Sequence, residues 1–197
     1  MKIGILGGTF NPIHIGHLIL AEEVREKLKL DKIIFVPTYL PPHKDNSDIA
    51  PAAARMAMVK LAIRGNRYFL ASDTEIRRDG RSYTIDTLKE FKSIYPQDEL
   101  YFIIGSDLLK YLDDWKDWGE IARMVKFIVA TRPGYPLEEI STYIASRQTG
   151  ASTVAIRAVD VSGFEIRKAI KENRSFRYLV PEVVYKYIVK KNLYRKA

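Results

Sequence analysis

The chain of 197 residues has the composition of an ordinary folded domain, with 47% hydrophobic and 28% charged residues. Apolar runs fall short of the roughly 20 residues that span a bilayer, and cysteine is absent, which excludes a membrane helix, a disulfide framework and thiol chemistry. The formal net charge of +8 suits anionic partners such as nucleotides, nucleic acid or phosphorylated metabolites.

Strand-like and helix-like patterns alternate along the chain. Short apolar runs predict strands at Lys2–Leu6, Lys32–Val36, Tyr68–Ala71, Leu100–Ile104, Lys126–Ala130 and Thr153–Arg157. Helical spacing of apolar residues predicts helices at His17–Leu28, Pro51–Arg64, Thr84–Tyr95, Leu137–Ser146, Gly163–Glu172 and Pro181–Lys191.

The strands are apolar on both faces, which is typical of a sheet covered on both sides. We therefore expect the α/β class, with a doubly wound, Rossmann-like, mostly parallel sheet, helices on both faces and a C-terminal helical segment. The length fits a single domain over residues 1–197. The composition and the lack of a signal-peptide pattern predict a cytoplasmic protein.

The stretch from Gly7 to His17, GGTFNPIHIGH, joins the first predicted strand to the first predicted helix. Such a loop presents backbone N–H groups and the positive end of a helix dipole to an anion. His14 and His17 are placed to add two more donors to a phosphate. Gly16 between them favours a close approach of the backbone to a ligand, because glycine in a first helical turn is otherwise unfavourable. The loop matches neither a Walker A sequence nor the GxGxxG dinucleotide fingerprint, so it predicts a third kind of phosphate site.

Two plainer interpretations of this loop stay open. Glycines after a first strand often serve only a tight turn. Two histidines on one helix face could bind zinc, but zinc needs a third ligand, and the chain has no cysteine and one further histidine, His43.

Further motifs follow the loop, each at or just after the end of a predicted strand, where parallel sheets bind ligands. In chain order they are Pro41-Pro42-His43-Lys44, Ser82–Leu88 (SYTIDTL), Gly105-Ser106-Asp107, Trp115, Arg132-Pro133-Gly134 and Val161–Arg167 (VSGFEIR). The ordered set spans nearly the whole chain. It resembles the nucleotidyltransferases with an H-x-G-H motif, and specifically the bacterial nicotinate-mononucleotide adenylyltransferases.

This resemblance implies an enzyme of NAD biosynthesis. It would transfer the adenylyl group of ATP to nicotinate mononucleotide, giving nicotinate adenine dinucleotide and pyrophosphate. The resemblance assigns His14 and His17 to the ATP phosphates, as the catalytic pair. The ATP-binding residues expected from the loop and from the resemblance are Gly7, Gly8, Thr9, Phe10, Gly16, Gly105, Asp107, Ser162 and Arg167.

Several of these ATP-binding assignments have simpler structural alternatives. Asp107, which the resemblance assigns to the ribose hydroxyls, could equally cap a short helix. Ser162 could cap the last motif's helix, with Arg167 on its surface. Phe164 stands where the related motif usually has a hydroxyl residue, so one phosphate donor is expected to be missing or replaced.

The middle of the chain is expected to select the acceptor. Free amides of Tyr83 and Thr84 at a helix start would bind a carboxylate rather than a carboxamide, and Trp115 offers a flat face to a pyridinium ring. The set expected to bind nicotinate mononucleotide is Asn11, His43, Lys44, Tyr83, Thr84 and Trp115. A capped helix, a packing tryptophan and a surface loop are the structural alternatives.

No acidic cluster in the sequence suggests a dedicated metal site, so Mg²⁺ is expected to bind through the ATP phosphates. The expected partners are ATP and nicotinate mononucleotide, without membrane or nucleic acid, and a homo-oligomer is left open. Two alternatives remain. One is another H-x-G-H transferase, such as phosphopantetheine adenylyltransferase. The other is a basic nucleic-acid-binding protein that uses the C-terminal Lys/Arg stretch, although this leaves the glycine-histidine loop unexplained.

Overall fold

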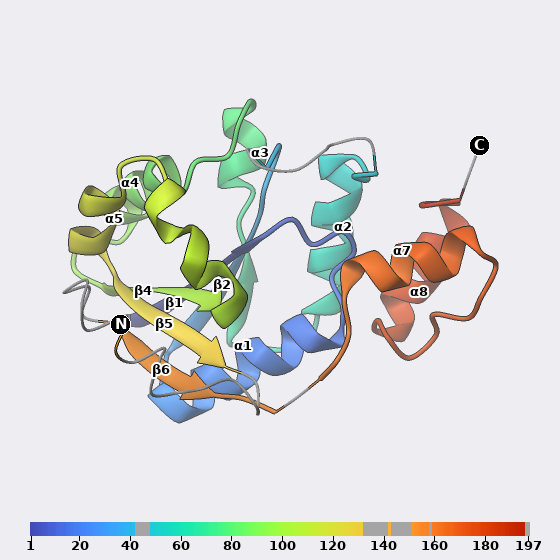
Figure 1. Ribbon diagram of the computed structural model, residues 1–197, viewed down its shortest axis with the longest axis horizontal. Coiled ribbons are helices and arrows are strands. Elements are labelled where there is room, and N and C mark those ends of the chain that lie inside the picture. Colours follow the sequence, from blue (N-terminus) through green and yellow to red (C-terminus); the bar gives the residue numbers. More distant parts are fainter. Residues whose placement is uncertain (42–47, 132–141, 143–150, 158, 196–197) are drawn as a thin grey trace.

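The computed structural model describes the chain except for residues 42–47, 132–141, 143–150, 158 and 196–197. Its centre is a six-stranded sheet in the order β3-β2-β1-β4-β5-β6 (Figure 1). All neighbouring strands are parallel. The strands are β1 (Lys2–Gly8), β2 (Lys32–Pro37), β3 (Phe69–Ala71), β4 (Glu99–Gly105), β5 (Lys126–Thr131) and β6 (Ser152–Ala155).

The strand order reverses between β1 and β4, which are neighbours in the sheet although far apart in sequence. Their register pairs Leu6 with Ile103, so Gly8 and Gly105 finish the two strands at the same edge. In open parallel sheets this is the position of the ligand crevice. The first loop and the Gly105-Ser106-Asp107 motif therefore begin side by side.

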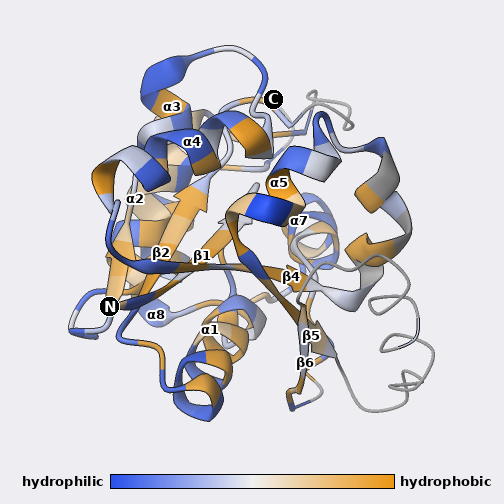
Figure 2. Ribbon diagram, turned by 90° about the vertical axis from the view of Figure 1, so that its left-hand side faces the viewer, coloured by the Kyte–Doolittle hydropathy of each residue, from blue (hydrophilic) through white to orange (hydrophobic). Residues whose placement is uncertain are grey.

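Helices cover both faces of the sheet. Their bounds are α1 (Ile15–Leu28), α2 (Ala52–Ala62), α3 (Thr74–Arg78), α4 (Thr84–Ile94), the 3-10 helix η1 (Ser106–Asp114), α5 (Trp118–Met124), α7 (Gly163–Lys171) and α8 (Glu182–Lys190). Figure 2 shows α1 and α8 on one side of the sheet and α4 and α5 on the other. The helix α2 packs against α8.

Two apolar clusters hold these layers together. The first core cluster joins one face of the sheet to α1, α2, α7 and α8, and includes Val24, Met58 and Ile188. The second core cluster joins the opposite face to α4, η1 and α5, and includes Leu88 and Ile121. Each fully buried side chain of this size stabilises the fold by about 1.5–3 kcal/mol. Together the clusters fix the sheet edge at which the first loop lies.

The predicted fold class is confirmed, and the sheet is parallel throughout the described residues. Predicted boundaries needed small corrections, because residues such as His14, Pro51 and Pro181 cap the helices from non-helical conformations. The predicted strand Thr153–Arg157 is shorter at its end, as β6 stops at Ala155. Residues 137–141 and 143–146 of the predicted helix Leu137–Ser146 lie outside the described residues. In the part of the chain that the structure describes, no helix is long and apolar enough to cross a membrane.

Among the described residues, two α-helices were not predicted from the sequence, α3 and α5, with five and seven residues. A helix this short completes only one or two turns, so it shows no 3.6-residue periodicity that distinguishes it from a loop. Both lie directly beside motifs that the sequence analysis singled out. The helix α3 precedes Ser82-Tyr83-Thr84, and α5 follows Trp115.

Truncation of Leu88, which is 0% exposed in the second core cluster, tests the packing that holds α4 on the sheet. Leu88→Ala is expected to lower the free energy of unfolding by about 2–5 kcal/mol, because it removes buried surface and leaves a cavity. Leu108→Ala is the control, since Leu108 is 38% exposed. This variant is expected to lower the free energy of unfolding by only about 0.5 kcal/mol. Urea unfolding measures both, and equal losses would contradict the assignment of Leu88 to the core.

Candidate active site

The two histidines of the first loop form a compact pair at the start of α1. His14 is the N-cap residue of the helix, with extended backbone angles, and its side chain is buried. Its backbone N–H donates to Nδ1 of His17 at 3.2 Å, and the two rings lie 3.7 Å apart between centroids. Because Nδ1 of His17 accepts a hydrogen bond, the neutral ring carries its proton on Nε2. His17 therefore presents Nε2–H as its donor.

Gly16 leaves space for this histidine pair. A Cβ at this position would lie 3.1 Å from Nδ1 of His14 and 3.8 Å from the carbonyl oxygen of Val161. The closest neighbour of Gly16 is thus the His14 ring, and the nearby Val161 carbonyl belongs to the late motif. The glycine allows the first loop, the late motif and the His14 ring to lie close together.

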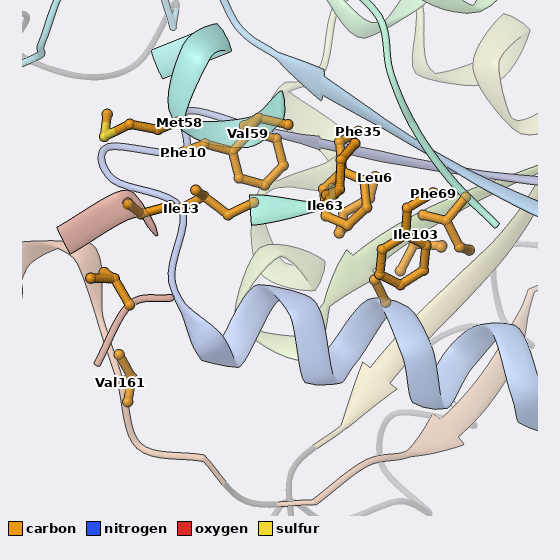
Figure 3. Packing of buried hydrophobic residues seen from close by; sticks show 14 of the residues in the cluster. Leu6, Phe10, Ile13, Phe35, Met58, Val59, Ile63, Phe69, Ile103 and Val161 are labelled. Atoms are coloured by element: carbon orange, nitrogen blue, oxygen red, sulfur yellow. The ribbon is translucent and has the colours of Figure 1, made fainter. Parts of the chain in front are cut away.

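The turn before His14 is anchored in the core by its apolar side chains. Phe10 is 2% exposed although its backbone is left-handed, with φ of 46°, and Ile13 is fully buried. Both side chains belong to the first core cluster, and Figure 3 shows them beside Met58 and Val59 of α2. The Phe10 ring also meets the His17 ring edge-on at 5.0 Å between centroids. The burial of Phe10 thus stabilises a backbone conformation that a bulky residue rarely adopts.

Arg55 of α2 holds the loop from inside the protein. It is 1% exposed, and Nη1 donates to the carbonyl oxygens of Thr9 at 2.8 Å and Thr38 at 2.6 Å. Nη2 donates to the Tyr39 carbonyl and Nε to the Ala50 carbonyl, each at 2.9 Å. Burial lowers the pKa of Arg55. Charge interactions with Tyr194 and Glu75 raise it in part. One side chain thereby joins the loop after β1 to the segment between β2 and α2.

Arg55 was not among the residues predicted from the sequence. A signal was present, because Arg55, Met58 and Val59 follow the spacing of one helix face, and all three are buried. A cation on an apolar face predicts a buried partner for it. The nature of those partners, carbonyl oxygens of distant loops, depends on the tertiary fold.

Asn11 and Arg167 connect the loop to the late motif. Nη1 of Arg167 donates to the Asn11 carbonyl at 2.8 Å. The Asn11 side chain donates to the Asp48 carbonyl at 2.9 Å and accepts from the Ala50 N–H at 3.0 Å. Gly163 permits this contact, since a Cβ there would lie 2.9 Å from the Asn11 carbonyl oxygen. Asn11 was predicted to bind the acceptor. In the structure its side-chain amide makes hydrogen bonds within the protein, to the backbone of Asp48 and Ala50.

Ser162 and Arg167 occupy different positions at the start of α7. Ser162 is the N-cap, and its Oγ accepts from the Glu165 N–H at 3.1 Å, which leaves the hydroxyl hydrogen able to donate. Arg167 is half-buried, and its guanidinium bonds the Asn11 carbonyl of the first loop. Phe164, the departure from the related motif, is 61% exposed. Phe164, Arg167 and Lys168 line a pocket of about 340 Å³ beside this helix start.

The Ser82-Tyr83-Thr84 motif is held by the segment after β2. The Tyr39 N–H donates to Oγ of Ser82 at 2.9 Å, and the Ser82 N–H donates to the Leu40 carbonyl at 3.0 Å. Tyr83 is the N-cap of α4 with an extended backbone, and Thr84 is the first helical residue. The predicted helix start is confirmed.

Trp115 is half-buried and borders the second core cluster together with Tyr83. Its ring meets Phe102 edge-on, with 5.8 Å between centroids, and Trp118 edge-on at 6.3 Å. The Lys116 ammonium lies 4.8 Å above the Tyr83 ring. The structure thus brings Tyr83 and Trp115 to one cluster, with Trp115 partly engaged in packing.

The remaining predicted residues follow the sheet edge. Gly7 and Gly8 end β1, and Gly105 ends β4 and caps η1, in which Asp107 is the second residue. His43, Lys44 and Arg132-Pro133-Gly134 lie outside the described residues. Among the described side chains, no group of three or more His, Asp and Glu could hold a metal ion.

The buried carboxyl of Glu75 contacts Thr87 in the first turn of α4. Glu75 is 6% exposed, and Oγ1 of Thr87 donates to its Oε1 at 2.7 Å. Burial raises the pKa of Glu75, while hydrogen bonds from Thr87 and Ser82 and the nearby guanidinium groups of Arg78 and Arg55 lower it in part. The net result is a pKa above the ordinary carboxyl value.

The chain is similar to known proteins over nearly its whole length. Residues 5–169 match the cytidylyltransferase-like family. A probable nicotinate-nucleotide adenylyltransferase of Desulfitobacterium hafniense is 42% identical over 198 residues, which cover 98% of this chain and 96% of that protein. A protein of the same description from Dehalococcoides mccartyi is 44% identical over 200 residues, covering 100% of this chain and 98% of the relative.

Solved structures share the fold at lower identity. Plasmodium falciparum nicotinic acid mononucleotide adenylyltransferase complexed with NaAD has a TM-score of 0.80 at 21% identity, covering 98% of this chain and 97% of that one. Its complex with APC gives the same TM-score and identity, with 98% and 96% coverage. The comparison establishes that the parallel sheet and its helices form the same architecture.

Replacement of Glu75 tests its buried environment. Because the pKa of Glu75 is raised in the folded protein, the native state binds this proton more tightly, and the free energy of unfolding should fall as pH rises from the ordinary carboxyl pKa through the native one. Glu75→Gln stays neutral and keeps an oxygen acceptor for Thr87. Urea unfolding gives the free energy of unfolding at about pH 5 and about pH 8. Between these two pH values it should fall less for Glu75→Gln than for the parent chain. The exposed carboxylate Glu26, changed to Gln, provides the control, and an identical pH slope in both variants would contradict the assignment.

Proposed function

Since the chain belongs to the cytidylyltransferase-like family and, within it, to the nicotinate-nucleotide adenylyltransferases, we propose that it transfers the adenylyl group of ATP to nicotinate mononucleotide. The products are nicotinate adenine dinucleotide and pyrophosphate, a step of NAD biosynthesis. The observation that carries the proposal is the histidine pair at the start of α1, with the His14 N–H bonded to Nδ1 of His17. That pair lies in a loop at the point where the strand order reverses.

The reaction needs alignment and charge stabilisation more than covalent help. A phosphate oxygen of the acceptor attacks the α-phosphorus of ATP and forms a new P–O bond. The bond from the α-phosphorus to the oxygen bridging to the β-phosphate breaks, and pyrophosphate leaves. Negative charge increases on the leaving group and on the oxygens of the α-phosphate, so fixed donors accelerate the step.

On the ATP side, two helix starts are proposed to supply the donors. The backbone of Thr9 and Phe10, the α1 N-terminus and the Nε2–H of His17 face the phosphates, with His14 beside them. The Ser162 hydroxyl, the α7 N-terminus and Arg167 contribute from the other side. Support for this arrangement comes from the hydrogen bond between Arg167 and the Asn11 carbonyl, which holds the two helix starts together. Gly105 and Asp107 are proposed to bind adenosine.

On the acceptor side, the proposed ligands of the nicotinate carboxylate are the amides of Tyr83 and Thr84. Trp115 would cover the pyridinium ring, a contact worth about 0.5–2 kcal/mol for a cation. The proposal keeps Asn11, His43 and Lys44 as further contacts for nicotinate mononucleotide. The fixed position of Ser82 supports it, because that residue sets where the next two amides begin.

Mg²⁺ is proposed to enter as part of the Mg–ATP substrate. The described residues offer no cluster of acidic or histidine side chains suited to a separate metal site. A small hard cation on nucleotide phosphates keeps most of its water ligands, so a few fixed cations and amides of the protein suffice around it. Residues 1–197 are proposed to act as one domain in this reaction.

The direct test of the function is an assay of product formation. The purified protein is incubated with Mg–ATP and, in parallel, with nicotinate mononucleotide, nicotinamide mononucleotide or phosphopantetheine. We expect dinucleotide and pyrophosphate in equal amounts with nicotinate mononucleotide, and slower turnover with the nicotinamide compound, because two backbone amides favour a carboxylate. Product from phosphopantetheine alone would overturn the proposed acceptor.

Loss of the His17 imidazole tests the phosphate site. His17→Ala removes one preorganised donor, so kcat should fall by about 10²–10³. Glu26→Ala changes an exposed residue of the same helix and should keep the parent kcat. Circular dichroism confirms that both variants are folded. A folded His17→Ala variant with the parent kcat would exclude His17 from the proposed role.

A further inference from the structure

Arg55 is a buried cation whose hydrogen bonds are made to neutral groups. It is 1% exposed, and all four of its hydrogen bonds to described residues go to backbone carbonyl oxygens. No described carboxylate forms an ion pair with it. A guanidinium in such surroundings keeps a positive potential that nearby water does not screen. This potential lies under the loop proposed to bind the ATP phosphates.

One of these hydrogen bonds lies on the peptide group that joins Thr9 to Phe10. Its carbonyl oxygen accepts from Nη1 of Arg55 at 2.8 Å, and its N–H belongs to Phe10. A loop that offers N–H groups to an anion turns its carbonyl oxygens the other way, where they need donors. A cation on the carbonyl polarises the whole peptide group and strengthens its N–H as a donor. Arg55 can therefore act on the phosphates through the backbone.

The other three hydrogen bonds fix the segment between β2 and α2. Thr38, Tyr39 and Ala50 supply the carbonyls, and this segment in turn binds Ser82 through Tyr39 and Leu40. Ser82 directly precedes the amides of Tyr83 and Thr84. We call the loop proposed to bind ATP (residues 7–17) the ATP loop, and the segment proposed to bind the acceptor (residues 82–84) the acceptor loop. A continuous set of hydrogen bonds thus runs from the ATP loop through Arg55 and Tyr39 to the acceptor loop.

We propose that Arg55 is a positioning residue that sets the ATP loop and the acceptor loop in one geometry and strengthens the Phe10 amide through its charge. This inference rests on the proposed adenylyl transfer. It assigns to a buried side chain an effect on turnover that acts through the backbone groups it positions. A displacement of about 1 Å between reacting groups is enough to lower a rate about 10²-fold.

Two variants separate the guanidinium fork from its charge. Arg55→Met removes both, and Arg55→Lys keeps a cation that reaches fewer carbonyls. With saturating substrates, we expect Arg55→Met to lower kcat per folded molecule by about 10², and Arg55→Lys by about tenfold. Arg64→Met, at an exposed position just after α2, is the matched control and should keep the parent kcat.

A binding measurement provides a readout independent of turnover. Calorimetric titration with inorganic tripolyphosphate should give a dissociation constant about tenfold higher for Arg55→Met than for the parent, with Arg55→Lys closer to the parent. Circular dichroism melting sets an assay temperature at which each variant is folded. A residue that only stabilised the fold would change the melting temperature and leave kcat and the dissociation constant per folded molecule unchanged.

The outcomes distinguish this inference from the proposed function. If the parent chain forms no dinucleotide, the proposed function fails, whatever the variants do. If the parent is active and folded Arg55→Met keeps its kcat within twofold, or Arg55→Lys is no better than Arg55→Met, the inference is overturned. Where Arg55→Met does not fold, Arg55→Lys decides, because a tenfold loss in kcat supports the proposal and the parent value overturns it.

Discussion

The orientation of a few peptide groups in the first loop is the constraint on which the site depends. Amides can face an anion only where their carbonyl oxygens are satisfied elsewhere. Here two arginines provide that satisfaction, Arg55 for Thr9 and Arg167 for Asn11. One comes from α2 and the other from α7, so helices from distant parts of the sequence must dock correctly before the loop takes its form. The form of the first loop thus depends on the tertiary fold.

The parallel sheet supplies the second condition. Because β1 and β4 end side by side, the first loop and η1 begin at one edge of the sheet, and the two core clusters fix the helices on either face. The loop itself contributes Phe10 and Ile13 to the first core cluster. A change in how these side chains pack would therefore also move the backbone N–H groups of the loop. Ser82 joins the segment before α4 to the same framework through Tyr39 and Leu40.

Much of this architecture could be predicted from the sequence. Strands buried on both faces, such as β1 and β2, show continuous apolar runs, and the longer helices show clear periodicity. The three-residue spacing of His14 and His17 predicted a joint role at one helix start. Hydrogen-bond direction within the pair, and hence the Nε2 proton of His17, could not be predicted, because it depends on the backbone angles of the N-cap.

What sequence patterns missed were interactions between segments. Arg55 carried a signal in its position on the buried face of α2, but its four carbonyl partners come from loops that only the fold brings together. Asn11 is a similar case, because a polar residue in a binding motif can serve the loop's own shape. Its side chain holds Asp48 and Ala50, contacts between residues far apart in sequence.

The left-handed backbone of Phe10 has a consequence for the motif as a transferable unit. An isolated peptide with the sequence GGTFNPIHIGH would lack the apolar pocket that offsets this unfavourable conformation, and would sample other turns instead. Transplanting the stretch into another parallel sheet would also require the apolar side chains of α2 that pack around Phe10, and the guanidinium groups of Arg55 and Arg167. The smallest unit that would keep this loop conformation is therefore β1 with α1, α2 and α7, which is far larger than the motif itself.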